Sequence, residues 1–133
     1  MAVKKIMTDK LVTVSPNDTV EHMQNILEKY NIHHLLVIDN ENLVGVISDR
    51  DILRIISPYI NTKVETEKDL FTLTRTASQL MTKKPITISP QASIRDAAKS
   101  LLDNKVSLLP VVNDDGNAIG VLSWKDVMRY IID

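Results

Sequence analysis

The chain of 133 residues contains one pattern twice, and this duplication limits its fold more than any other feature. The segment 6–16 (IMTDKLVTVSP) returns as 80–90 (LMTKKPITISP), and 43–51 (LVGVISDRD) returns as 118–126 (AIGVLSWKD). One extra residue near Gly116 shifts the register, within a stretch rich in turn-forming Asn and Asp. A unit of about 50 residues buries little core alone, so we expect the two copies to pack together.

Within each copy, strand-like and helix-like segments alternate. Short β-branched segments at 12–14 and 86–88 predict a first strand, and each ends in Ser-Pro, which favours a turn. Apolar runs separated by Asn- and Asp-rich turns predict two further strands in each copy, at 35–38, 43–47, 108–112 and 118–122. Thr19 and Ser93 stand at N-cap positions, each before an amphipathic helix.

The apolar spacing predicts which helical side chains face the core. The stripes of the first helices are Val20, Met23, Leu27 and Tyr30 in one copy, and Ile94, Ala97, Ala98, Leu101 and Leu102 in the other. Second helices are predicted at 49–56 and 124–132, with faces of Ile52, Leu53, Ile55, Ile56, Val127, Met128 and Ile131. The fold class is therefore α/β (α+β), with β-α-β-β-α repeats at 1–57 and 77–133. A polar linker at 58–76 is expected to hold a helical turn around 70–73.

Composition excludes several functions. Lys and Arg number 16 against 17 Asp and Glu, a balance that argues against a protein that coats nucleic acid or an acidic membrane. The chain has no cysteine, and its longest apolar run, 108–112, is too short to span a membrane, so we expect a cytoplasmic protein. Three scattered glycines form no phosphate-binding loop, and no metal site or catalytic constellation is apparent. We therefore expect no enzyme activity.

One polar motif occurs in both copies, at the point where a glycine-containing strand becomes a helix. It has the form Ser-x-cation-Asp, as Ser48 to Asp51 and as Ser123 to Asp126. One interpretation is helix capping, in which the serine accepts from a free backbone N–H and the aspartate complements the helix dipole. The other is a ligand site, in which the carboxylate accepts from a ribose diol and the neighbouring donors favour phosphate. Duplication alone does not decide between them.

At these residues the sequence resembles the CBS domain, and two copies in tandem resemble a Bateman module. The resemblance rests on Met-Thr, a strand ending in Ser-Pro, a helix, Leu-Pro-Val-Val-Asn, an Asp-Gly turn and Gly-Val-Leu-Ser-x-x-Asp, and it covers nearly the whole chain. It implies two repeats related by a pseudo-twofold axis. It further implies binding of an adenosine-containing ligand, with AMP, ADP or ATP foremost and S-adenosylmethionine or NAD as further candidates, in two clefts between the repeats. No other cofactor and no metal is implied.

The resemblance also implies which residues line each cleft. One cleft would join Ser48 and Asp51 to Ile86, Val106, Ser107, Leu108 and Pro110, and the other would join Ser123 and Asp126 to Val12, Ile32, His33 and His34. The aspartates are the implied ribose ligands, Val12 and Ile86 the adenine walls, and His33, His34 and Ser107 the phosphate-side groups. Two departures stand out, because Leu36 replaces the proline matched by Pro110, and Trp124 occupies the position of Asp49.

The leading functional prediction is a stand-alone regulatory module that signals to a separate effector protein. The alternative is a ligand-free structural or protein-interaction module whose Ser-x-x-Asp motifs only cap helices. We expect a homodimer, because the second helices carry more apolar residues than one buried face needs and the family pairs modules through them: Ile55, Ile56, Met128, Ile131 and Ile132. Trp124 is expected to be an anchor in that interface.

Overall fold

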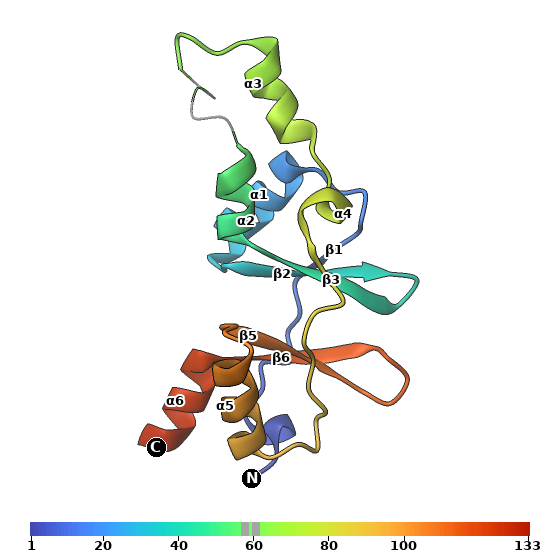
Figure 1. The fold of residues 1–133 in the computed structure, drawn as a ribbon, viewed down its shortest axis with the longest axis vertical. Helices are drawn as coiled ribbons and strands as arrows, with labels where there is room; N and C mark the ends of the chain where they lie inside the picture. The colour runs from blue at the N-terminus through green and yellow to red at the C-terminus, as the bar shows by residue number, and fades with distance from the viewer. Residues whose placement is uncertain (57–58, 60–61) are drawn as a thin grey trace. The chain divides into compact units, whose positions relative to one another are not determined.

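The computed structural model describes residues 1–56, 59 and 62–133, so Ser57, at the predicted end of the first repeat, and part of the predicted linker lie outside the described residues. The chain divides into two compact units (Figure 1). The first-repeat unit contains 12–40 and 44–83, and the second-repeat unit contains 1–11, 41–43 and 84–133. Each unit therefore combines the central elements of one repeat with the leading segment of the other.

The first-repeat unit is built on a four-stranded sheet. Its strands lie in the order β1 (Thr13–Val14), β2 (His34–Asp39), β3 (Asn42–Ser48) and β4 (Thr82–Lys83). β1 is parallel to β2, with Thr13 opposite Leu36, and β3 is antiparallel to β4, with Val46 opposite Thr82. The helices are α1 (Val20–Tyr30), α2 (Asp49–Ile55), α3 (Glu67–Phe71) and α4 (Ala77–Leu80), with a 3-10 turn, η2 (Thr72–Thr74).

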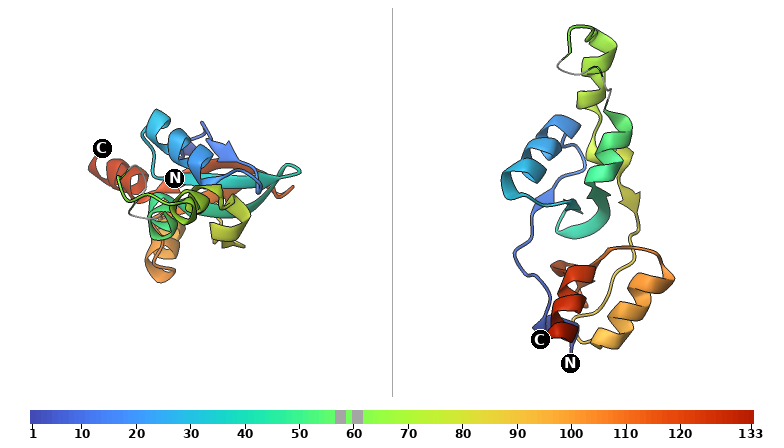
Figure 2. Two further views of the ribbon diagram at one scale, coloured as in Figure 1. Left: turned by 90° about the horizontal axis from the view of Figure 1, so that it is seen from above. Right: turned by 90° about the vertical axis from the view of Figure 1, so that its left-hand side faces the viewer.

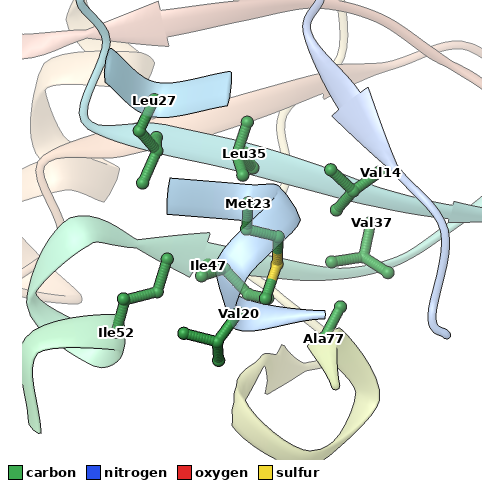
Figure 3. Close-up of a cluster of buried hydrophobic side chains, with 9 residues drawn as sticks. All are labelled: Val14, Val20, Met23, Leu27, Leu35, Val37, Ile47, Ile52 and Ala77. Carbon is green, nitrogen blue, oxygen red and sulfur yellow. The ribbon is translucent and has the colours of Figure 1, made fainter. Parts of the chain in front are cut away.

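Helices α1 and α2 contact each other, and their apolar faces meet the sheet in one core (Figure 3). The Met23 side chain lies near the centre of this cluster, among side chains from the strands and from the other helices. The core consists of Val14, Val20, Met23, Leu27, Leu35, Val37, Ile47, Ile52 and Ala77. Its members Ile47 and Ile52 lie on either side of the boundary between β3 and α2, which is where the first Ser-x-x-Asp motif lies.

The second-repeat unit repeats this plan with fewer paired strands. β5 (Leu108–Val112) and β6 (Ala118–Ser123) form an antiparallel hairpin, and α5 (Ile94–Asp103) and α6 (Trp124–Ile132) lie side by side against it (Figure 2). The 3-10 turn η1 (Val3–Lys5) adds Val3 to the core of this unit. The remaining core residues are Ile94, Ala97, Leu101, Leu109, Val111, Leu122 and Val127.

The leading Met-Thr segments make the same contact in both units. Thr8 bridges Val121 of β6, and Thr82 pairs with Val46 of β3. In each case the methionine before the threonine lies over the strand glycine, Met7 over Gly120 and Met81 over Gly45. A side chain at either glycine would collide with the methionine, so the strand glycines make room for the leading segments.

Most predicted elements are confirmed. The predicted 108–112 strand and 124–132 helix match β5 and α6, and Thr19 and Ser93 cap α1 and α5 by accepting from backbone N–H groups. Helix α3 and η2 confirm a helical segment near 70–73. Within the described residues, no helix is long and apolar enough to cross a membrane.

Two kinds of prediction were wrong. Residues 86–88 form no strand, and only Ile88 bridges Val111. Several residues assigned to buried helical faces are exposed, because apolar spacing alone does not show how wide a face the rest of the unit covers: Tyr30, Leu53, Leu102, Met128 and Ile131.

Candidate functional site

Both Ser-x-x-Asp motifs form complete capping boxes. The Ser48 backbone N–H donates to Asp51 Oδ2 at 2.8 Å, and the Asp51 N–H donates to Ser48 Oγ at 3.2 Å. The second copy repeats both bonds, at 2.9 Å between Ser123 N and Asp126 Oδ2 and at 3.3 Å between Asp126 N and Ser123 Oγ. The capping interpretation is thus geometrically correct for each helix, and each aspartate is held in one orientation at the helix start.

The second oxygen of each aspartate faces an arginine that the sequence interpretation missed. Asp126 Oδ1 accepts from Arg129 at 3.3 Å, and Asp51 Oδ1 lies 3.7 Å from Arg54. The aspartate side chains differ in exposure, 23% for Asp51 and 9% for Asp126. The signal was available in the sequence, because Asp-x-x-Arg occurs in both copies and places the two side chains on one helix face.

Each unit also brings the start of its central strand to its own Ser-x-x-Asp motif. The Asp49 N–H donates to the His33 carbonyl at 2.9 Å, and the Trp124 N–H donates to the Ser107 carbonyl at 3.2 Å. His33 and Ser107 therefore occupy equivalent places beside the motifs Ser48 to Asp51 and Ser123 to Asp126. In each unit, the residue that precedes the central strand therefore lies beside the serine hydroxyl and the aspartate carboxylate of the motif.

The side chains at this junction differ between the units. In the first-repeat unit, His33 Nδ1 lies 2.8 Å from Asp49 Oδ2, and this hydrogen bond is the main reason why the pKa of Asp49 is below its usual value. Next to it, the pKa of His34 is lowered, chiefly because the imidazole is partly buried and its charged form loses hydration. In the second-repeat unit, Ser107 and Trp124 hold the equivalent positions, and neither side chain titrates near neutral pH.

The other predicted lining residues differ in how much surface they offer. Val12 and Ile32 pack against the first core, Val106 packs against the second, and Leu108 is half-buried at the start of β5. Ile86 is 43% exposed, which leaves its side chain open to a ligand. Pro110 lies fully buried within β5, so its side chain offers no surface in this structure.

Trp124 is half-buried and packs against the second core. Part of its apolar surface is therefore accounted for by packing within its own unit, and its role as an interface anchor stays a prediction.

The predicted groupings join residues that belong to different units. Ser48 and Asp51 lie in the first-repeat unit, whereas Ile86 and residues 106–110 lie in the second. These groupings stay predictions, as does the grouping of His33 and His34 with Asp126. Among the described residues, no group of three His, Asp or Glu side chains is arranged to hold a metal ion.

The duplicated fold with a matched Ser-x-x-Asp junction in each half defines a class, the tandem α/β modules of Bateman type. The family profile of the CBS domain matches residues 3–58 and 77–133, which is most of the chain. The chain belongs to the CBS domain family.

Individual relatives agree with this assignment. The structure of CBSX2 in complex with AMP is 31% identical, with a TM-score of 0.82 over 98% of this chain and 96% of that one. The CBS domain pair of MJ0100, solved in complex with 5′-methylthioadenosine and S-adenosyl-L-methionine, is 26% identical with a TM-score of 0.79, over 98% of this chain and 95% of that one. A CBS domain-containing protein of Dictyostelium discoideum is 32% identical, over 98% of this chain and 90% of its own length.

The chain also matches part of a larger protein. It is 33% identical to inosine-5′-monophosphate dehydrogenase of Methanocaldococcus jannaschii over 96% of this chain, but spans only 24% of that enzyme's length. The match is confined to a region the size of one CBS pair.

Proposed function

We propose that the chain is a regulatory module that binds an adenosine-containing ligand at its two Ser-x-x-Asp motifs and passes the state of occupancy to a separate effector protein. The main support is the Ser-x-x-Asp junction, which occurs in both repeats with the same geometry. In addition, the chain is similar over almost its full length to CBS pairs solved with adenosyl ligands. A homodimer in the cytoplasm without enzyme activity of its own belongs to the same proposal.

The ligands of the similar structures share one chemical part. AMP, 5′-methylthioadenosine and S-adenosylmethionine all contain adenosine with a free 2′,3′-diol, and they differ in the group at the 5′ position. A carboxylate held at a helix start is a suitable acceptor for such a diol. We therefore assign ribose recognition to Asp51 and Asp126, and selection among ligands to the groups that would meet the 5′ substituent.

The ligand would have to use carboxylates that already cap a helix. In each motif Oδ2 is occupied by the serine N–H, and Oδ1 faces an arginine. Because Oδ1 can accept more than one hydrogen bond, a diol can be added there without breaking the cap.

Thermal unfolding in the presence of AMP, ADP, ATP, S-adenosylmethionine, 5′-methylthioadenosine and NAD tests this function, with GTP and 2′-deoxy-AMP as controls. At about 100 times its dissociation constant, a ligand of the native state stabilises the fold by about 2.7 kcal/mol. We expect stabilisation by at least one adenosine ligand, and less by its 2′-deoxy analogue, which lacks half of the diol.

A matched set of variants separates binding from capping. Asp51→Asn and Asp126→Asn should lose the ligand response, whereas Asp69→Asn alters an equivalent capping box, Thr66 to Asp69 on α3, outside the repeats. Asp69→Asn should lower stability and keep the response. If all three variants only lower the melting temperature and the response persists, the motifs are caps and the structural alternative holds.

A further inference from the structure

Two methionines hold the ends of the leading segments, residues 1–8 and 77–82, against their units. The Met81 sulfur is the atom nearest to the space that a side chain on Gly45 would fill, and the Met7 sulfur is nearest to the same space at Gly120. Both methionines are half-buried and pack against the core of their own unit. The same contact therefore occurs once in each repeat, between a thioether and the backbone of a strand.

The beginning of each segment is anchored separately from its end. Val3 and Ala77, near the beginnings of the two segments, are fully buried in the cores. The ends are held by the methionine and by the threonine that follows it, and Thr8 exchanges two backbone hydrogen bonds with Val121, both at 2.9 Å. Loss of a methionine contact should therefore loosen the end of its segment while the beginning stays in the core.

Among the five methionines of the chain, these two combine access to solvent with lack of space. Met1 and Met128 are exposed, so an oxygen added to either sulfur would lie in water, whereas Met23 is fully buried. Met7 and Met81 are partly open to solvent, but their sulfurs lie too close to the strand glycines for another atom to fit between. A sulfoxide is larger and more polar than a thioether, and its oxygen needs a hydrogen-bond donor or water.

We propose that Met7 and Met81 are sites of reversible oxidation, at which a peroxide converts the thioether to a sulfoxide and thereby releases the end of the leading segment. The sulfur donates an electron pair to one peroxide oxygen, so that an S–O bond forms and the O–O bond breaks. The proton of the transferred oxygen moves to the departing one, and hydrogen peroxide leaves as water. The sulfur has then lost two electrons, and the oxidised side chain no longer fits against the glycine.

The second-repeat unit should respond more strongly than the first. The space at Gly120 also contains the Thr8 carbonyl oxygen, which lies 3.0 Å from a Cβ placed on that glycine. A carbonyl oxygen repels the oxygen of a sulfoxide. At Gly45, by contrast, the three nearest atoms all belong to the Met81 side chain itself. Oxidation of Met7 should therefore disturb its segment more than oxidation of Met81.

Treatment of the folded chain with dilute hydrogen peroxide tests the proposal. Peptide mass spectrometry locates each sulfoxide, and thermal unfolding measures stability. We expect the melting temperature to fall by about 3–6 °C as Met7 and Met81 are oxidised. Methionine sulfoxide reductases should restore the original value.

Hydrogen exchange shows where the structure has loosened. The amides of Thr8 and Val121 should exchange faster after oxidation, because each donates to the other residue's carbonyl across the released contact. Amides inside α5, which lies in the same unit and has no methionine, should keep their protection.

Leucine variants assign the effect to the two sulfurs. Leucine is close to methionine in volume and cannot be oxidised in this way, so Met7→Leu and Met81→Leu should retain most of the stability. The double variant should lose the response to peroxide. Met128→Leu removes an exposed methionine and should respond like the unaltered chain.

The proposal is overturned if peroxide modifies only Met1 and Met128 in the folded chain, or if Met7 and Met81 are oxidised without a change in melting temperature. An equal fall in the double variant and in the unaltered chain would also overturn it. If the leucine variants do not fold, the unaltered chain still decides, because the fall must then follow the sulfoxide content of Met7 and Met81 and not that of Met128. None of these measurements needs a ligand, so their outcome is independent of the proposed function.

Discussion

At the scale of single residues, the aspartates of the two motifs act in stability as well as in the proposed binding. Each carboxylate completes a capping box, and Ser123 additionally donates its hydroxyl hydrogen to Asp126 Oδ2 at 3.1 Å. The cap contributes to the folded state whether or not a ligand is present. Effects on stability and on binding must therefore be measured separately for these residues.

Removal of the serine caps should lower stability in both units. Ser48→Ala and Ser123→Ala each lose the acceptor of a backbone N–H, which costs about 0.5–2 kcal/mol of unfolding free energy. Urea denaturation followed by circular dichroism measures the loss. Gln91→Ala offers a control, since Gln91 is exposed in a loop and caps no helix, and it should leave the unfolding midpoint close to its original value.

His34 should make the fold less stable in acid. Its pKa in the folded chain lies below the ordinary 6.5, so the unfolded chain takes up the proton more readily. The penalty is absent well above pH 6.5 and grows as the pH falls below that value. His34→Gln should therefore flatten the dependence of the urea midpoint on pH between about 7.5 and 5.5, whereas His22→Gln should not. An unchanged slope in His34→Gln would contradict this assignment.

Sequence patterns were sufficient for the local part of the site. The capping residues Ser48, Ser123, Thr19 and Ser93 act on N–H groups three positions away, so their geometry follows from sequence spacing alone. The contact of His33 with Asp49 could not be predicted in this way, because it depends on the tertiary packing that brings a strand start to a helix start.

At the scale of elements, one proline explains why equivalent segments differ. In the first repeat, the Leu36 N–H donates to the Val12 carbonyl at 3.5 Å and β1 pairs with β2. In the second repeat, Pro110 has no N–H to donate to the equivalent Ile86, so only the bridge at Ile88 remains. The β-branched pattern at 86–88 is a correct sign of extended backbone, but the ladder also depends on the partner strand.

The strand glycines should tolerate a methyl group unequally. The three atoms nearest to a Cβ at Gly45 all belong to the Met81 side chain, which is flexible, whereas a Cβ at Gly120 would meet Met7 and lie 3.0 Å from the Thr8 carbonyl oxygen. Gly120→Ala should therefore cost about 1–3 kcal/mol of unfolding free energy, and Gly45→Ala less.

Double variants test the origin of this difference. Met81→Ala should remove most of the penalty of Gly45→Ala, because it deletes the two nearest atoms, Sδ and Cγ. Met7→Ala should relieve Gly120→Ala less, because the backbone oxygen stays in place. Equal relief in the two units would show that the methionines alone set the cost.

At the scale of the whole molecule, duplication conceals which copy a segment joins. The leading segment of each repeat carries Met-Thr, and each of the two strand pairs offers a Gly-Val edge. Because both copies present the same partner chemistry, the sequence does not show that residues 1–11 join the second-repeat unit and residues 77–83 the first. The repeat count was therefore predictable and the exchange of segments was not.

The exposed apolar side chains of the C-terminal helix α6 favour self-association of the chain. Ile131 and Ile132 are 67% and 77% exposed on α6, and such side chains on a helix surface favour a partner surface that removes them from water. Because the proposed homodimer uses this helix, sedimentation equilibrium of the unaltered chain should show a dimer, and Ile131→Asp should shift it to monomer. Leu102→Asp, which changes an equally exposed residue on α5, should stay dimeric. Equal dissociation of both variants would mean that the dimer interface is not specific to α6. A monomeric unaltered chain would rule out the homodimer, and a single copy of the chain would then have to signal to the effector protein.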